Sequence, residues 1–408
     1  MVGRLRPGER PDPSKPQGTD TLPEIEHVVV VMMENHSFDN YLGVLGRGDG
    51  LTIGPNGRPT NACPAADGRP LRAFHMPNTC QLPTQPSQTW NATHAQWDGG
   101  RMDGFVRSDS GPVAMGYWAG EDLPFYYGLA RTFPVCDRWF ASCMGQTFPN
   151  RRFLLAGTAR GNIATDKKTV ADFQPPNGTI MELLNRHAIT WRDYFSDLPT
   201  TALFPPVLQA NGDKVVTIER FFADAAAGAL PSFSLVEPNY DHASEENSDD
   251  ITTGESFVAR VVGAVMTGPG WPKTLLVWTY DEHGGYYDHV PPPPAVPPDE
   301  VGPRLGAADV PGGYDVYGLR VPAVVVSPHA RKDYVSHVVH DHTSILKLLD
   351  TKFNLPALTD RDGTADALLD CLDLGSPPAF LTPPVLPAPR NPSDTTPLCT
   401  SPGLIPKG

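Results

Sequence analysis

The sequence predicts an α/β layered fold built on a largely parallel sheet. Apolar runs of strand length, rich in β-branched residues, alternate with stretches of helical periodicity, which is typical of α/β domains. The 46 prolines and 38 glycines among 408 residues exclude long uninterrupted helices. Because 40% of the residues are hydrophobic and only 19% are charged, the chain can form a core, and wholesale disorder is excluded.

The first predicted element is a strand at residues 25–33, IEHVVVVMM, which stops at Glu34-Asn35. An apolar β-branched run of this length indicates a strand that is buried on both faces. The residues that follow, HSFDNYLGVLG, predict a short helix ending at glycine. Residues 47–90 are rich in Gly, Pro, Asn and Thr without periodicity, so we expect a long loop insertion there.

Two helices are predicted in the middle of the chain. The first covers LPFYYGLARTF at residues 123–133, and VCDRWFASCM leads from it to the second, within GQTFPNRRFLLAGT at residues 145–158. Thr147, two residues before Pro149, suits the start of the second helix. We expect Thr147 to be its N-cap and Pro149 to lie in its first turn.

The second half of the chain repeats the strand and helix alternation and ends in a proline-rich stretch. Its strands are SFSLVEPN, TLLVWTY and LRVPAVVVSP, and its helices are ESFVARVVGAVMTG and HTSILKLLDTKFNL. The TLLVWTY strand ends at Asp281-Glu282, as the first strand ends at Glu34-Asn35. Ligands of parallel sheets bind beyond the carboxyl ends of the strands, so we expect these two acidic pairs to lie together at one rim.

These patterns predict three parts of the chain. Residues 1–22 carry prolines and charges, show no apolar secretory signal, and are expected to form a flexible lead. Residues 23–374 are expected to form a single domain with the insertion around 47–90. Residues 375–408 are expected to form a proline-rich tail or surface arm.

Charge and hydropathy limit the partners. The net charge of −14 argues against a nucleic-acid partner and against tight electrostatic binding to anionic membranes, and no apolar stretch reaches the ~20 residues of a membrane span.

The six cysteines lack zinc-site spacing, and their even number favours disulfides and an exported protein. Since no signal segment is visible, a cytoplasmic location remains the alternative. The oligomeric state is left open.

The candidate site residues suit phosphoryl transfer. A divalent cation held by carboxylates neutralises phosphate oxygens, and carboxylate ligands without a His/Cys cluster favour one ion of the Mg²⁺, Ca²⁺ or Mn²⁺ class. Backbone N–H groups at the start of the Thr147 helix would hold the phosphoryl oxygens. Thr147, bound to the metal, is then expected to attack phosphorus and form a phosphothreonine.

Three sequence blocks resemble the signature blocks of one known family. IEHVVVVMMENHSFDNYLG, GQTFPNRRFLLAGT and TYDEHGGYYDHVPPP are similar to those of the bacterial phosphoesterase family that holds the phosphatidylcholine-type phospholipases C and the AcpA-like acid phosphatases. The resemblance covers roughly residues 24–355 in the family's order. It implies an alkaline-phosphatase-like, three-layer α/β/α sandwich with one divalent metal ion at the strand rim.

The resemblance also implies roles for individual residues. Glu34, Asp281 and Glu282 match metal-ligand positions, and Asn35 matches a residue that contacts a phosphoryl oxygen or the metal. Thr147 matches the nucleophile position. His94 resembles a histidine that touches the substrate phosphate and donates a proton.

One family feature is missing from this chain. Many members have a His-Pro-Pro run before a Gly-Glu helix start, whereas this chain has DHASEENSDDITTGES. We expect His242 to take that role from a shifted position. Otherwise Glu246 or Asn247 stands there and the acid-base step rests on His94.

Taken together, these features predict a metal-dependent phosphoric ester hydrolase. The predicted substrates are alcohol phosphodiesters, including phospholipids such as phosphatidylcholine, cleaved in the manner of a phospholipase C. One alternative is a broad-specificity acid phosphomonoesterase. The other, of a different class, is an envelope-associated binding protein that keeps the fold without activity.

Overall fold

The computed structural model describes residues 4–81, 86–171 and 173–391. Its centre is an eight-stranded sheet with the strand order β12-β6-β11-β10-β1-β9-β7-β8. The strands are β1 (His27–Met33), β6 (Val135–Cys136), β7 (Trp191–Phe195), β8 (Val215–Thr217), β9 (Phe233–Val236), β10 (Thr274–Tyr280), β11 (Ala323–Val326) and β12 (Val335–Ser336). Strand β11 is antiparallel to β10 and β6, and the other pairs are parallel, so the predicted mostly parallel sheet is confirmed.

Two central strands determine where the site lies. Strand β1 pairs with β10 along its whole length, from His27 opposite Thr274 to Met33 opposite Tyr280. Residues 28–33 of β1 and all of β10 are buried, because helices cover both faces of the sheet. The continuous apolar runs that predicted these strands are therefore explained by burial on both sides.

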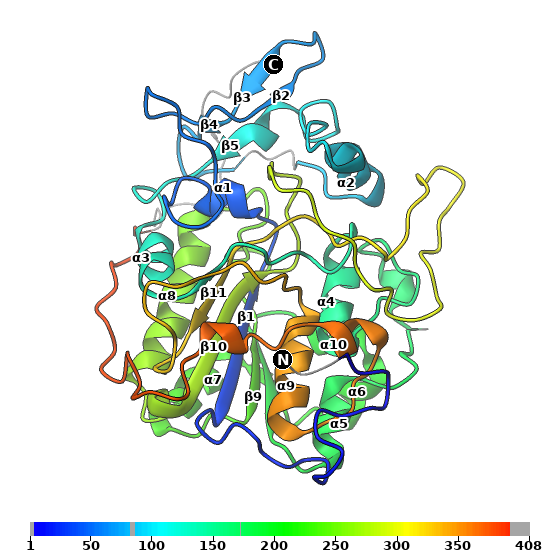
Figure 1. The fold of residues 1–408 in the computed structure, drawn as a ribbon, viewed down its shortest axis with the longest axis vertical. Helices are drawn as coiled ribbons and strands as arrows, with labels where there is room; N and C mark the ends of the chain where they lie inside the picture. Colours follow the sequence, from blue (N-terminus) through cyan, green and yellow to red (C-terminus); the bar gives the residue numbers. More distant parts are fainter. Residues whose placement is uncertain (1–3, 82–85, 172, 392–408) are drawn as a thin grey trace.

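Helices form the two outer layers. Figure 1 shows one group on one side of the sheet and a second group on the other, which confirms the predicted three-layer α/β/α arrangement. The first group is α3 (Pro124–Thr132), α7 (Ile218–Ala227) and α8 (Ile251–Thr267). The second is α4 (Thr147–Ala156), α5 (Ile180–Arg186), α9 (Thr343–Phe353) and α10 (Asp360–Thr364).

The predicted insertion contains short strands. Within residues 47–90, β2 (Ala62–Pro64) pairs with β3 (Pro70–Arg72), and β4 (Phe74–His75) pairs with β5 (Gly116–Tyr117) outside it. Strands of two or three residues are too short to show a period in the sequence. Helix α1 (Phe38–Leu42) precedes the insertion, and α2 (Trp90–Trp97) begins at its end.

Both ends of the described chain lie against the domain. The backbone N–H of Leu5 donates to the carbonyl of Gly363 at 2.9 Å, and that of Gly8 donates to Ala357 at 2.9 Å. Near the other end, the Trp271 indole donates to the Phe380 carbonyl at 2.9 Å. The division at residues 22 and 374 stays a prediction, and residues 392–408 of the expected tail, with Cys399, lie outside the described residues.

Four of the cysteines form no disulfide bond. Cys63, Cys136, Cys143 and Cys371 are buried free thiols, so none of these four is bonded to another.

Within the part of the chain that the structure describes, no helix combines the length and the apolar character that crossing a bilayer requires.

Candidate active site

Three parallel strands bring acidic side chains to one rim of the sheet. Glu34-Asn35 follows β1, Asp281-Glu282 follows β10, and Glu237 follows β9. The Asp281 N–H donates to the Met33 carbonyl at 3.2 Å, so the parallel register continues into the acidic pairs. The structure thus places the two predicted pairs side by side.

A buried arginine lies among these carboxylates. Arg151, on α4, places Nε 3.1 Å from Asp281 Oδ2 and Nη1 3.2 Å from Glu237 Oε2. Its Nη2 lies 3.9 Å from Glu34 Oε1, and its guanidinium lies 5.1 Å from the centre of the Tyr240 ring. Since Arg151 is only 2% exposed, it compensates carboxylates that would otherwise be buried without a counter-charge.

Several polar atoms at this rim have no hydrogen-bond partner. Both side-chain atoms of Asn35 and Oε1 of Glu282 are buried and unpaired. Asn35 also has a φ of 74°, a left-handed conformation that is uncommon for a residue other than glycine. The chain packs closely here: Gly284 has a φ of 67°, and a Cβ on it would lie 1.8 Å from the Asn35 carbonyl oxygen.

The acidic groups carry more negative charge than Arg151 balances. Burial, and then the neighbouring carboxylate of Asp281, raise the pKa values of Glu34 and Glu282 well above their ordinary value. Burial also raises the pKa of Asp281, although Arg151 opposes this. Excess buried carboxylates with unpaired oxygen atoms fit a hard divalent cation, which binds oxygen ligands. Glu34, Asn35, Asp281 and Glu282 are the residues that could hold it.

The helix of the predicted nucleophile starts one residue earlier than expected. Gln146, not Thr147, is the N-cap of α4, and the Gln146 side chain makes no capping hydrogen bond. The Thr165 hydroxyl accepts instead from the N–H of Phe148 in the first turn, at 3.4 Å. Thr147 is therefore the first helical residue, and Pro149 lies in the first turn as predicted. The Thr147 hydroxyl is thus not occupied in capping the helix.

Thr147 and Glu34 line one cavity of about 480 Å³. Arg151, Tyr240 and Glu246 line it as well. The apolar part of its wall consists of Phe148, Leu198, Pro199, Ala202 and Leu203. The cavity thus brings together a hydroxyl at a helix start, the Glu34 carboxylate of the rim and an apolar wall.

The predicted histidines lie outside this lining. His94, on α2, donates through Nδ1 to the Trp90 carbonyl at 2.7 Å, and a Cβ on Gly312 would lie 2.5 Å from its Nε2. Burial lowers the pKa of His94. His242 is exposed, whereas Glu246, four residues later, does line the cavity. The roles of both histidines stay predictions.

Sequence reasoning missed Glu237 and Arg151. Glu237 follows a predicted strand, SFSLVEPN, so the rule that selected Glu34 and Asp281 also points to it. Thr200 donates to its carboxylate twice, from N–H and from Oγ1, both at 2.7 Å. Nothing in the sequence signals Arg151, because its partners come from three separate strands.

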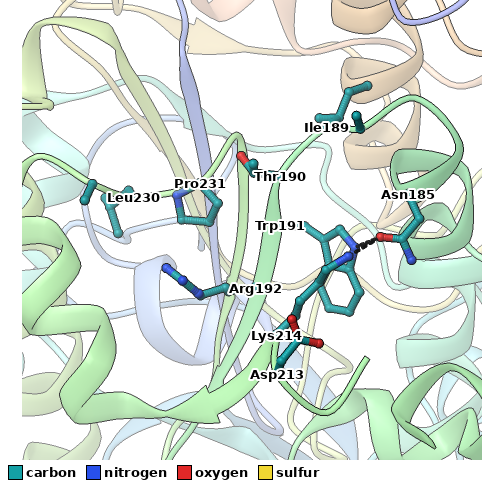
Figure 2. Close-up of a pocket in the computed structure, with 11 residues that line it drawn as sticks. Asn185, Ile189, Thr190, Trp191, Arg192, Asp213, Lys214, Leu230 and Pro231 are labelled. Carbon is teal, nitrogen blue, oxygen red and sulfur yellow. Dashed lines mark hydrogen bonds between the residues drawn. The ribbon is translucent and has the colours of Figure 1, made fainter. Parts of the chain in front are cut away.

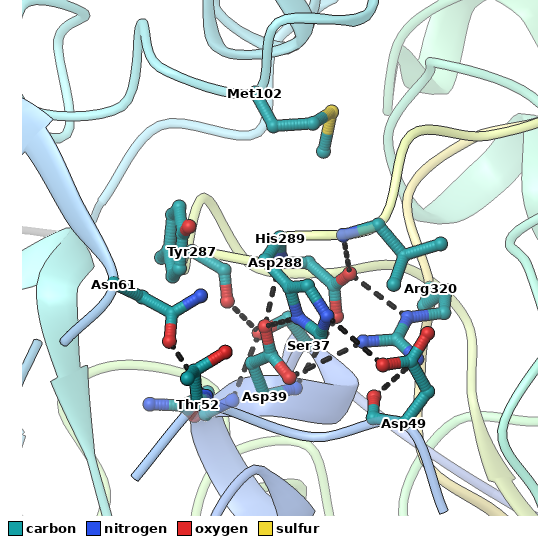
Figure 3. Close-up of polar contacts among 12 residues, drawn as sticks. Ser37, Asp39, Asp49, Thr52, Asn61, Met102, Tyr287, Asp288, His289 and Arg320 are labelled. Atoms are coloured by element: carbon teal, nitrogen blue, oxygen red, sulfur yellow. Dashed lines mark hydrogen bonds and ion pairs between the residues drawn. The ribbon is translucent and has the colours of Figure 1, made fainter. Parts of the chain in front are cut away.

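A second charge network joins α1 to the segment that follows β10 (Figure 3). His289 Nδ1 lies 2.6 Å from Asp39 Oδ2, and Arg320 Nε lies 2.8 Å from Asp288 Oδ1. Asp39, Asp288 and His289 are close enough to hold a metal ion, as are His340, Asp366 and Asp370 elsewhere. Burial alone would lower the pKa of His289, but the hydrogen bond that His289 donates to Asp39 and the charge of Asp39 outweigh burial and raise the pKa to about 9. With Arg320 and a protonated His289 present, Asp39 and Asp288 already have counter-charges.

A further hollow lies at the opposite end of the strands (Figure 2). Thr190, Trp191 and Pro231 line it near the starts of β7 and β9, together with Asn185 and Lys214. Asn185 Oδ1 accepts from the Trp191 indole at 2.9 Å. Because ligand sites of parallel sheets lie beyond the carboxyl ends of strands, the rim with Glu34 and Asp281 is the better candidate for chemistry.

The match to a family of phosphoesterases, together with the acidic rim and a hydroxyl at a helix start, gives the class of this protein: it is a phosphoric ester hydrolase. The chain belongs to the phosphoesterase family, which it matches over residues 25–356. It is 31% identical to non-specific phospholipase C6 of Arabidopsis thaliana over 399 residues, 89% of this chain and 75% of that protein. It is likewise 31% identical to phospholipase C B of Mycobacterium tuberculosis, over 88% of this chain and 79% of that protein.

Among solved structures the chain is similar to a protein of the alkaline phosphatase superfamily from Vibrio parahaemolyticus. The TM-score is 0.46 at 11% identity, and the match covers 89% of this chain and 75% of that one. The lipoteichoic acid synthase LtaP from Listeria monocytogenes matches with a TM-score of 0.43 at 8% identity, over 86% and 77% of the two chains.

Proposed function

We propose that the chain cleaves phosphodiesters such as phosphatidylcholine in the manner of a phospholipase C, with Thr147 as the nucleophile. The observation that carries this proposal is the cavity that Thr147 shares with Glu34 and an apolar wall. Phe148, Leu198 and Leu203 offer the apolar surface that a diacylglycerol leaving group needs. The relatives named phospholipase C support the same assignment.

We also propose that one divalent cation of the Mg²⁺, Ca²⁺ or Mn²⁺ class binds at the rim. Glu34, Asn35, Asp281 and Glu282 would hold it, with the Thr147 hydroxyl as a further ligand. The donor set is oxygen only, and the unpaired atoms of Asn35 and Glu282 support the assignment. When bound, such a cation neutralises phosphoryl charge and lowers the pKa of a coordinated hydroxyl.

In the proposed reaction, Thr147 Oγ1 loses its proton and forms a bond to phosphorus. The bond from phosphorus to the glycerol oxygen breaks, and that oxygen takes up a proton as diacylglycerol leaves. Water then attacks the phosphothreonine, restores the hydroxyl and releases the phosphorylated head group. Backbone N–H groups in the first turn of α4 hold the phosphoryl oxygens, and His94 or His242 is the proposed proton carrier.

The test compares substitutions at two residues that line the same cavity. Thr147→Ala should lower turnover of phosphatidylcholine at least ~1000-fold, and Thr147→Ser should keep part of it, because serine retains a hydroxyl. Gln88→Ala is the control, since Gln88 also lines the cavity and has no proposed role in the reaction. Wild-type turnover by Thr147→Ala would sink the mechanism.

A substrate comparison separates the phosphodiesterase from the phosphomonoesterase. Turnover of phosphatidylcholine should exceed that of p-nitrophenyl phosphate, and replacing Leu203 by serine should lower the first rate more than the second. A preference for the monoester, with no effect of Leu203→Ser on the ratio, would favour an acid phosphatase instead.

A further inference from the structure

The cavity lined by Thr147 and Glu34 is called the active-site cavity below. A second cavity, of about 560 Å³, lies next to it, and more cationic than anionic side chains line this second cavity. The segment of residues 162–169 contributes to both: Thr165 and Lys167 line the active-site cavity, whereas Asp166 and Lys168 line the second one. Helix α4 also contributes to both, because Arg151 lines the first and Arg152 lines the second.

Arg152 is buried without a carboxylate partner. Its residue exposure is 0%, its Nη1 donates to Thr169 Oγ1 at 3.2 Å, and its Nη2 donates to the Thr169 carbonyl at 3.1 Å. Its guanidinium lies 4.1 Å from the centre of the Phe173 ring. Nε is buried and has no hydrogen-bond partner, and among the described residues no carboxylate forms an ion pair with Arg152.

Three further cations line the same cavity: Arg160, Lys168 and Arg304. None of them forms an ion pair with a residue in the described ranges. Each of the two carboxylates of the lining accepts a hydrogen bond from a nearby backbone N–H, Asp166 from that of Lys168 at 2.9 Å and Asp309 from that of Gly306 at 2.7 Å. Four cations therefore face two acids, in a chain whose net charge is −14.

We propose that this cavity, which we call the Arg152 pocket, binds a phosphate group distinct from the one that is hydrolysed. A buried guanidinium with an unpaired N–H is costly unless an anion compensates it, and phosphate accepts from several arginines at once. Arg152 provides the buried contact, and Arg160, Lys168 and Arg304 provide the outer contacts. The phosphate is either the head group of an acidic lipid such as phosphatidic acid or free inorganic phosphate.

The first experiment titrates inorganic phosphate into the wild-type protein and into Arg160→Gln/Arg304→Gln by calorimetry. The matched control is Arg58→Gln/Arg72→Gln, which removes two exposed arginines remote from the pocket in sequence. Phosphate should bind at least tenfold more weakly to the pocket variant than to the control. Its inhibition constant against p-nitrophenyl phosphate, which reports the active site, should stay the same in both. Equal calorimetric affinity in both variants would overturn the proposal.

A second arm identifies the source of the phosphate. Phosphatidylcholine vesicles with and without phosphatidic acid are sedimented with each protein. Retention that requires both phosphatidic acid and the pocket arginines assigns a lipid head group, whereas calorimetric binding without such retention assigns free phosphate. If neither phosphate nor phosphatidic acid vesicles distinguish the pocket variant from the control, the Arg152 pocket is not an anion site.

Arg152→Met tests the buried contact itself. It keeps an unbranched apolar stem in place of the arginine stem and removes a charge that no carboxylate compensates, so the variant should fold. Phosphate should raise the melting temperature of the wild type more than that of Arg152→Met, whose remaining rise comes from phosphate bound at the active site. An equal rise in both proteins would contradict the role of Arg152.

Discussion

His289 Nδ1 lies 2.6 Å from Asp39 Oδ2, and this contact joins helix α1 to the loop that follows β10 (Figure 3). Asp39 comes five residues after Glu34, and His289 comes seven residues after Glu282. Arg320 Nη2 reinforces the link from 3.2 Å to Asp39 Oδ1. The two acidic pairs of the rim are thus held together by a second ionic contact outside the active-site cavity.

Replacing His289 by glutamine should lower stability in a pH-dependent way. The folded state raises the pKa of His289 from 6.5 to about 9, so the protonated form favours folding. Its contribution is complete below pH 6.5 and is lost as the pH rises through about 9. His289→Gln should therefore cost about 2 kcal/mol at pH 6 and much less at pH 10, as measured by urea denaturation.

The control for this prediction is His337→Gln. His337 also lies near an aspartate, at 2.9 Å from Asp137, but its side chain is 71% exposed. Exposed ion pairs contribute little, so this variant should unfold almost like the wild type at both pH values. Equal losses in the two variants would show that the Asp39 contact has no special role.

The sequence predicted the central strands and the rim because these depend on local composition. Strand β1 is apolar from Val28 to Met33 and β10 from Leu275 to Trp278, and an acid follows each strand directly. Strand β7, with the sequence WRDYF, carries two charges and shows no such run. Asp193 within it is tolerated because the N–H of Thr201 donates to its carboxylate at 3.0 Å, a contact made only in the folded chain.

Residues of the candidate site could be predicted from the sequence where a single strand end determines their position, and not where several elements meet. Glu34 and Asp281 follow from the strand rule, and the register then brings them together. Arg151 depends on α4 packing over three strand ends, which no sequence period encodes. The position of Glu246 in the cavity, and of His242 outside it, likewise depends on how residues 237–250 turn after β9.

Arg151→Met should destabilise the protein strongly. The substitution leaves Asp281 and Glu237 buried without their guanidinium, and removing one partner of a buried ion pair costs about 3–5 kcal/mol. Arg151→Lys should recover part of this loss, since it restores a charge but only one of the contacts. The free energy of unfolding in urea measures both.

Arg220→Met provides the comparison for Arg151. Arg220 pairs with Asp224 at 2.7 Å, but its side chain is 53% exposed. Its loss should cost under about 1 kcal/mol. If Arg151→Met were as mild, the acids of the rim would have to be neutral in the folded protein.

The stability of the wild type should fall as the pH rises because of Glu245, and Glu245→Gln should remove this fall. Glu245 lies in the core and accepts from Tyr126 Oη at 2.6 Å and from Tyr41 Oη at 3.1 Å. Burial raises its pKa from 4.5 to about 8, although the tyrosine hydrogen bonds oppose the shift. Between pH 4.5 and about 8, the Glu245 carboxyl therefore keeps its proton in the folded state and has lost it in the unfolded state. Stability should fall as the pH rises through this window, by up to about 1.4 kcal/mol per pH unit.

Thermal unfolding from pH 5 to pH 9 checks this prediction. The melting temperature of Glu245→Gln should fall less with pH than that of the wild type. Tyr126→Phe removes one hydrogen bond to the carboxylate, which should raise the pKa of Glu245 further and extend the fall to higher pH. Parallel pH profiles for all three proteins would contradict the assignment to Glu245.

A divalent cation should stabilise the folded protein through the rim formed by Glu34, Asn35, Asp281 and Glu282. After treatment with a chelator, adding Mg²⁺, Ca²⁺ or Mn²⁺ at 100 times its dissociation constant should raise the free energy of unfolding by about 2.7 kcal/mol. Glu282→Gln should abolish most of this gain, because it removes a charge whose Oε1 has no partner in the protein. Asp288→Asn is the control, since Asp288 already pairs with Arg320 at 2.8 Å. If Asp288→Asn abolished the gain and Glu282→Gln did not, the cation would bind at Asp39, Asp288 and His289 instead of at the rim.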